Sequence, residues 1–160
     1  MADTAFRVIQ PGDARTISLP GITMQLMITS DMTGGALFMA EEETAPRGGP
    51  PLHIHHQQTE IFRVLHGLYR FQAGDQTAEL AAGGMLIVPP GTPHAFMNIS
   101  DGPSRLQFSL TPAIRAEQAF GRLDDIAKSG GPPDPAQFNA EMVEFGIELV
   151  GPPLAAMEPS

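Results

Sequence analysis

The chain has 160 residues, 42% of them hydrophobic, which suits a single domain (residues 1–160) with a substantial buried core. Acidic residues outnumber basic ones 18 to 9, and the net charge of −9 repels phosphate backbones and anionic lipid, so we expect no nucleic-acid or membrane partner. The chain has no cysteine, which excludes disulfides, thiolate metal sites and cysteine nucleophiles.

The N-terminus, residues 1–4, lacks the basic stretch and following apolar stretch of a signal peptide. No apolar run in the chain approaches the roughly 20 residues that span a bilayer. We therefore expect a cytoplasmic protein.

From about residue 5 to 110 the sequence has the pattern of short strands. Met24, Leu26 and Ile28 are apolar and alternate with polar residues, and a similar alternation recurs over residues 106–110. Gly, Pro, Asn and Asp residues separate these segments. Period-two alternation between turn residues predicts an antiparallel sandwich or barrel.

After residue 111 the apolar residues recur at helical spacing instead. Thr111-Pro112 fits a helix N-cap followed by proline, with Gly130-Gly131 as the end of that helix. A second helix is predicted to start at Asp134-Pro135, where Gln137 completes a pattern like a capping box. Its apolar stripe consists of Phe138, Met142 and Phe145. We expect this helical extension, about residues 112–150, to cover the barrel end or a sheet edge, with direct substrate contact as the alternative.

All five histidines lie within the segment from residue 53 to residue 94. His53 and His55 are two residues apart, so on a strand their imidazoles point to the same face. Glu60 would face the other way on an unbroken strand, but the polar stretch 56–59 can supply a turn or bulge that resets the register. The strand from Glu60 onward then begins with its carboxylate on the face of the histidines.

His94 follows directly after a short apolar strand and a proline- and glycine-rich turn, residues 89–93. Such a turn is rigid, and rigid placement is what a metal ligand requires. Three imidazoles and one carboxylate suit one divalent transition metal, Fe, Mn, Ni, Cu or Zn, rather than calcium or magnesium. An isolated His-x-His pair would more simply be two surface residues; the addition of Glu60 and His94 favours the metal site.

At these residues the sequence resembles the cupin superfamily. The first family motif, G(X)5HXH(X)3-4E(X)6G, is matched at His53, His55, Glu60 and Gly67; its leading glycine comes one residue late, at Gly48, with Arg47 in the expected place. The second motif, G(X)5PXG(X)2H(X)3N, is matched at Gly83, Pro89, Gly91, His94 and Asn98. The resemblance implies an all-β cupin jelly-roll barrel (double-stranded β-helix) with C-terminal α-helices, and His53, His55, Glu60 and His94 as metal ligands.

The lead-in at residues 49–53 and the closing segment 144–153 look more narrowly like quercetin 2,3-dioxygenase-like small cupins. That likeness implies cleavage of a flavonol-, catechol- or enol-like molecule with O2, in which Glu60 is both ligand and catalytic base. A cupin isomerase or decarboxylase, or a non-catalytic metal-assisted binder, are the alternatives. A DNA-binding regulator is not expected, because no basic recognition helix is present.

Four apolar residues near the predicted site are candidates for the pocket lining, although apolar side chains inside a barrel are often plain core. They are Met39, Phe62, Phe71 and Phe96. The apolar N-terminal segment, residues 6–28, is a candidate dimer contact, and we expect a homodimer.

Overall fold

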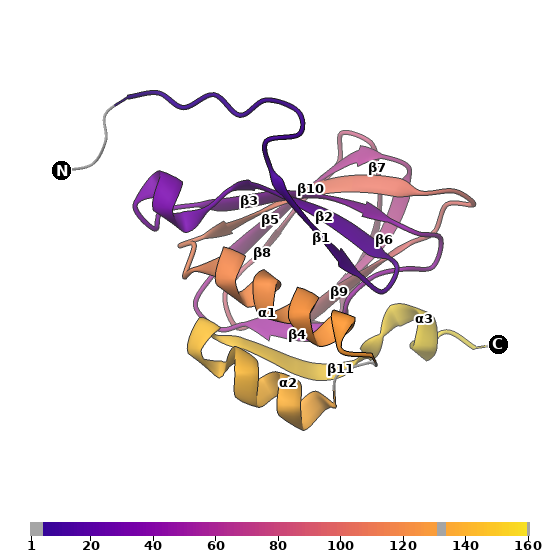
Figure 1. The fold of residues 1–160 in the computed structure, drawn as a ribbon. Helices are drawn as coiled ribbons and strands as arrows, with labels where there is room; N and C mark the ends of the chain where they lie inside the picture. The colour runs from indigo at the N-terminus through magenta and orange to yellow at the C-terminus, as the bar shows by residue number, and fades with distance from the viewer. Residues whose placement is uncertain (1–4, 131–133, 160) are drawn as a thin grey trace.

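The computed structural model describes residues 5–130 and 134–159, and within them two antiparallel sheets face each other (Figure 1). The expectation drawn from residues 1–4 lies outside the described residues. The first sheet has the order β1 (Arg15–Leu19), β2 (Ile22–Ile28), β3 (Phe38–Thr44), β10 (Ser104–Thr111), β5 (Thr59–His66), β8 (Met85–Val88). The second has the order β11 (Ile147–Pro153), β4 (Pro51–His55), β9 (His94–Asn98), β6 (Leu68–Ala73), β7 (Gln76–Ala81).

The core lies between the two sheets, on the inward face of each strand. Met24 and Leu26 on β2 are buried, as the alternation predicts, while Gln25 between them is exposed. On β5 the same parity buries Phe62 and Val64. Each such large apolar side chain contributes about 1.5–3 kcal/mol on burial. This arrangement confirms a jelly roll of two antiparallel sheets.

The predicted start of the first helix is wrong by four residues, because α1 spans Ala116–Lys128. Thr111 is the last residue of β10, paired with Thr59 on β5, and it therefore cannot begin a helix. The residue before α1 is Arg115, in the left-handed conformation. The helix ends at Lys128 and is followed by Ser129, one residue before the predicted Gly130 stop. The second residue of that stop, Gly131, lies outside the described residues.

The second predicted helix is confirmed as α2, which spans Pro135–Met142. The Asp134 carboxylate accepts a hydrogen bond from the Gln137 backbone N–H (3.3 Å). Its predicted stripe, Phe138, Met142 and Phe145, is buried. Three shorter helices complete the described elements: η1 (Ser30–Thr33), η2 (Val143–Phe145) and α3 (Leu154–Met157). None of the described helices is long and apolar enough to cross a membrane.

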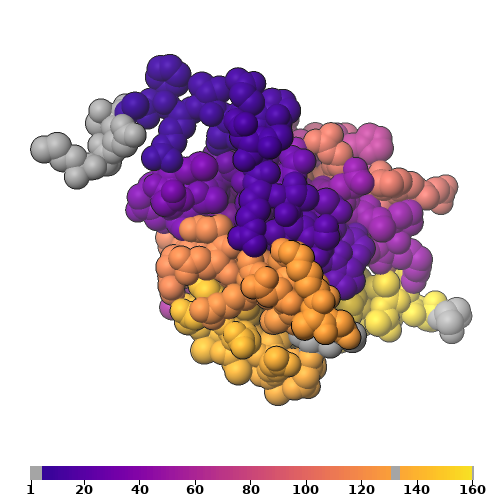
Figure 2. Space-filling view, viewed as in Figure 1, coloured from indigo at the N-terminus to yellow at the C-terminus, as the bar shows by residue number. Residues whose placement is uncertain are grey.

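The C-terminal helices join the two sheets along one side of the sandwich. The α1 helix packs on β1, where the buried Asp124 carboxylate accepts from the Ser18 backbone N–H (3.4 Å) and lies 2.7 Å from the Lys128 ammonium. The α2 helix packs on β11. Figure 2 shows these helices, in orange and yellow, side by side below the indigo N-terminal strands. A second core unites them with β11, formed by Ala119, Phe138, Met142, Phe145 and Ile147.

The strand β1, in the segment expected to mediate a dimer, lies at the edge of the first sheet. The residues before it extend away from the sheets (Figure 1), and Phe6 is 89% exposed. An open strand edge can pair with a second chain. The homodimer stays a prediction.

Candidate metal centre

Four side chains from three strands converge between the sheets. His53 and His55 lie on β4, and His94 on the adjacent β9 is the cross-strand partner of His53. Glu60 lies on β5 of the opposite sheet. One ligand atom from each side chain lies within 4.8 Å of the other three. Ligands bonded at about 2.0–2.2 Å to one ion are at most about 4.4 Å apart, so the four fit a single ion after a small contraction.

The turn that carries His94 is fastened to the strand that carries His55. Gly91 adopts a left-handed φ of 79°, which glycine accepts without steric cost. Its backbone N–H donates to the His55 carbonyl oxygen (2.9 Å). After His55, the His56 backbone N–H donates to Gly146 (2.8 Å), and the chain turns before β5 begins. This turn resets the register and brings Glu60 inward, as the spacing predicts.

The loop before β4 explains the one departure from the first cupin motif. Arg47 occupies the place of the motif glycine and has a left-handed φ of 61°. Its guanidinium donates to the Glu158 carboxylate (3.2 Å) and to the Ala155 carbonyl (3.4 Å), and both bonds hold this unfavourable conformation. The glycine that sterics require is Gly49, where an added Cβ would lie 1.9 Å from the Phe96 carbonyl oxygen.

Each of the three imidazoles is held by a hydrogen bond on the side away from the centre. The Nδ1–H of His53 donates to the Pro51 carbonyl (2.8 Å), and that of His94 donates to the Thr92 carbonyl (2.9 Å). The Nδ1–H of His55 donates to the Gln58 side-chain oxygen (2.9 Å). Because carbonyl oxygens only accept, each Nδ1 carries a proton, and Nε2 is the nitrogen that each ring would offer to a metal.

Gln58 is a functional residue that the sequence reasoning missed. It is 2% exposed, and its amide nitrogen donates to the Pro112 and Ala113 carbonyls, both at 2.9 Å. These two bonds fix which way the amide points, so its oxygen must face His55. In the sequence Gln58 is one of several polar residues in a turn, and only its place three residues after His55 distinguishes it.

Gln58→Leu is expected to weaken metal binding by about 10- to 100-fold, because His55 loses the acceptor that orients its ring. The affinity is measured by competition with a metal chelator. Gln57→Leu is the matched control, since Gln57 is the exposed neighbour in the same turn. Equal affinities in the two variants would contradict the orienting role of Gln58.

The site's electrostatics favour neutral imidazoles at His53 and His55 beside an ionised Glu60 carboxylate. Burial lowers the pKa of His53 to about 3, with further lowering by His94 and His55. Burial also lowers the pKa of His55. Burial alone would raise the pKa of Glu60, but its electrostatic interactions with the surrounding imidazoles, first His55, and its hydrogen bond with His94 (Nε2 to Oε2, 2.7 Å) outweigh burial and hold that pKa well below its usual range. The resulting states are those that metal ligation requires.

His94 is the exception among the three imidazoles. Burial would lower its pKa, yet the hydrogen bond and charge of Glu60 raise it instead. The contact that raises it joins His94 Nε2 and Glu60 Oε2, which lie 2.7 Å apart.

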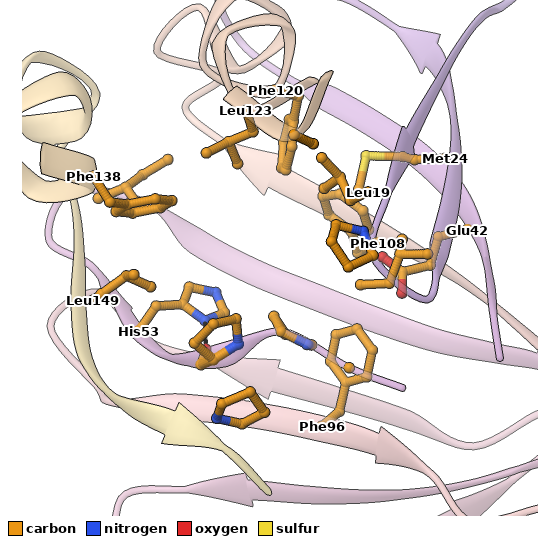
Figure 3. Close-up of a pocket in the computed structure, with 18 of the residues that line it drawn as sticks. Leu19, Met24, Glu42, His53, Phe96, Phe108, Phe120, Leu123, Phe138 and Leu149 are labelled. Carbon is orange, nitrogen blue, oxygen red and sulfur yellow. Dashed lines mark hydrogen bonds between the residues drawn. The ribbon is translucent and has the colours of Figure 1, made fainter. Parts of the chain in front are cut away.

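A cavity of about 340 Å³ opens onto His53, His55 and Glu60 (Figure 3). Its walls are almost entirely apolar. Strands of both sheets supply Phe62, Phe96 and Phe108. The N-terminal strands supply Leu19, Ile22 and Met24 to the wall, and the C-terminal part of the chain supplies Phe120, Leu123, Ile126, Phe138 and Leu149.

Two of the four residues named as candidate pocket lining, Phe62 and Phe96, are in the cavity wall, and two are not. Phe71 is buried in the core, with its ring centroid 5.2 Å from that of Phe62. Met39 lies between Phe38 and Ala40, which face the core, so strand parity points it outward. The helical extension was expected either to cover a sheet edge or to contact substrate. Helices α1 and α2 pack on the edge strands β1 and β11, and they also form part of the cavity wall.

Comparison with known proteins identifies the fold that carries these four side chains. Residues 40–110 match the family model described as the cupin domain, and all four lie within that range. A search of the curated proteins found no match. In contrast, α1, α2 and β11 lie outside the matched residues.

Several solved structures share the fold at low sequence identity. KdgF from Halomonas sp. has 15% identity and a TM-score of 0.61 over 68% of this chain and 94% of that one. A predicted oxalate decarboxylase from Thermotoga maritima has 19% identity and a TM-score of 0.59, covering 66% and 99%. The polyketide cyclase RemF from Streptomyces resistomycificus has 22% identity and a TM-score of 0.57, covering 67% and 80%. All three share the fold of this chain, while the names of the second and third describe different reactions, a decarboxylation and a cyclisation.

Proposed function

Because residues 40–110 match the cupin-domain family model, we propose that the chain is a metal-dependent dioxygenase that cleaves a flavonol-, catechol- or enol-like small molecule with O2. The observation that carries this proposal is a three-histidine, one-glutamate cluster that opens directly into an apolar cavity. Such a cavity accepts a largely apolar, ring-shaped substrate.

His53, His55, Glu60 and His94 would hold one divalent transition metal, and their nitrogen and oxygen donors suit Fe, Mn, Ni, Cu or Zn. When bound, such an ion supplies positive charge that acidifies a substrate hydroxyl and orients the reactants. The outer hydrogen bonds of the three imidazoles keep the donor set in place before the ion arrives.

The residues of the chain provide the remaining chemistry. Glu60 accepts the proton of the substrate hydroxyl and returns it to the product. Phe62, Phe96 and Phe108 hold the ring and exclude water. The carbon–carbon bond of the enol breaks and both atoms of O2 enter the products as new carbon–oxygen bonds, so no external reductant is needed.

Other reactions of cupin-fold proteins fit this cavity less well. A predicted oxalate decarboxylase and a sugar phosphate isomerase are among the similar structures. Oxalate and sugar phosphates are anions, and no lysine or arginine is among the residues that line the cavity in the described part of the chain. An apolar substrate is therefore favoured over a small anionic one.

The proposal is tested by metal analysis of the natively purified protein, followed by oxygen-electrode assays with flavonols, catechols and β-diketones. We expect one transition metal per chain and O2 uptake equal to the substrate consumed. Substrate conversion without O2 uptake would instead indicate an isomerase or decarboxylase. Tight binding with no product after hours would indicate a non-catalytic binding protein.

A further inference from the structure

A second buried carboxyl group faces the cavity but is not part of the metal centre. Glu42 lies on β3, is 4% exposed and is one of the residues that line the cavity. Figure 3 shows Glu42 and His53 at opposite sides of the cavity. A polar group in an apolar wall costs free energy unless it has a partner, so its presence calls for a physical reason.

Only one of the two Glu42 carboxyl oxygens is paired within the protein. The Thr44 hydroxyl donates to Oε1 (2.9 Å), and the Tyr69 hydroxyl donates in turn to Thr44 (3.0 Å). For Oε2 no hydrogen bond exists among the described residues. No side-chain nitrogen or oxygen atom of the described residues is both fully buried and unpaired, so Oε2 keeps contact with the cavity space.

The hydrogen bond from Thr44 also orients the group. Because Oε1 accepts from Thr44, a proton on a neutral Glu42 belongs on Oε2, the oxygen that borders the cavity. Burial raises the pKa of Glu42 to about 8; the Thr44 bond opposes this shift and the charge of Glu60 adds to it. At neutral pH Glu42 therefore presents an O–H donor to the cavity.

We propose that Glu42 is a substrate-binding residue whose Oε2–H donates a hydrogen bond to an acceptor oxygen at the end of the ligand that lies away from the metal centre. The ligand is then a two-ended molecule: a metal-binding oxygen at one end, an apolar ring body, and a phenol, ether or carbonyl oxygen at the other. The metal-binding end of this ligand rests on the proposed function. The acceptor oxygen at the other end rests only on the position of Glu42 in the cavity wall.

The test measures ligand affinity of the metal-loaded protein by calorimetry without O2, so that binding is read without turnover. The probes are 3-hydroxyflavone and its 4′-hydroxy and 7-hydroxy analogues, which add one oxygen at either far end. We expect wild-type protein to bind one analogue about fivefold to tenfold more tightly than the parent. Glu42→Gln, whose amide N–H replaces the O–H, should keep this preference, and Glu42→Leu should lose it.

Glu43→Leu is the matched control, because Glu43 is the exposed neighbour on the opposite face of β3. Thermal melting verifies that each variant is folded. A preference that survives in Glu42→Leu, or no preference in wild type, overturns the proposal for Glu42. If the preference is found but no O2 is consumed, only the dioxygenase proposal fails. If no probe binds wild-type protein, both the two-ended ligand and the binding role of Glu42 are rejected.

Discussion

Glu60→Gln is expected to lose activity by about 10²- to 10⁴-fold while keeping a substantial part of its metal. Glutamine is nearly the same size and its amide oxygen can still coordinate, and the three imidazoles are unchanged. The amide cannot accept a proton, however, and it carries no charge. In wild type the Glu60 Oε2 atom lies 2.7 Å from His94 Nε2 and 3.4 Å from His55 Nε2, so the carboxylate lies directly at the centre.

The measurement is the rate of O2 uptake per bound metal ion, with metal content determined on the same sample. Glu43→Gln removes an equal charge from an exposed position and should leave the rate unchanged. Full turnover per metal ion in Glu60→Gln would remove the carboxylate from the proton-transfer step. A variant without metal would instead show that the three imidazoles alone do not hold the ion.

Glu42→Gln is expected to stabilise the metal-free protein at pH 8 and to have little effect at pH 4.5. The pKa of Glu42 is raised from 4.5 to about 8 in the folded state. Between these two values the folded protein binds a proton that the unfolded chain has released, so the contribution of Glu42 to stability is full below pH 4.5 and is lost as pH rises to about 8. The loss is on the order of 3–5 kcal/mol, and glutamine, which does not titrate, avoids it.

The measurement is urea unfolding of wild type and variant with chelator present, at several pH values from 4.5 to 8.5. The difference between the two curves isolates Glu42, because other titrating groups are common to both proteins. Glu43→Gln serves as the exposed control. Parallel stability curves for wild type and Glu42→Gln would show that Glu42 has the same pKa folded and unfolded, and that it is not a neutral acid in the cavity at pH 7.

The residues of the candidate metal centre could be named from the sequence because their geometry is local. His53 and His55 are related by strand parity, and His94 follows a turn of fixed shape. Their convergence with Glu60 then needs only the pairing of β4 with β9 and a facing sheet. The first helix start was wrong because Thr111-Pro112 has the composition of a helix start, while the pairing of Thr111 with β5 extends β10 through that position.

Glu42 and Gln58 illustrate signals that were present but ambiguous. Strand parity places Glu42 on the same face as Phe38 and Ala40, yet a glutamate beside two other glutamates suggests a solvated strand. Gln58 is one polar residue among several in a turn. In both cases the contacts that reveal the role involve residues far along the chain. Tyr69 donates a hydrogen bond to Thr44, which in turn donates to Glu42. Gln58 donates to the carbonyl oxygens of residues 112 and 113.

From the sequence by itself follow the sandwich of short strands, the second helix with its cap, and the identity of the four convergent side chains. Tertiary structure alone decided that Phe120, Phe138 and Leu149 form a cavity wall, that β11 pairs beside β4, and that Glu42 faces the same space. The physical reason is the distance along the sequence over which each kind of interaction acts. Alternation, turns and caps act over a few neighbouring residues, whereas the wall forms from segments some 60 or more residues beyond Glu60, joined only by the burial of apolar surface in the folded chain.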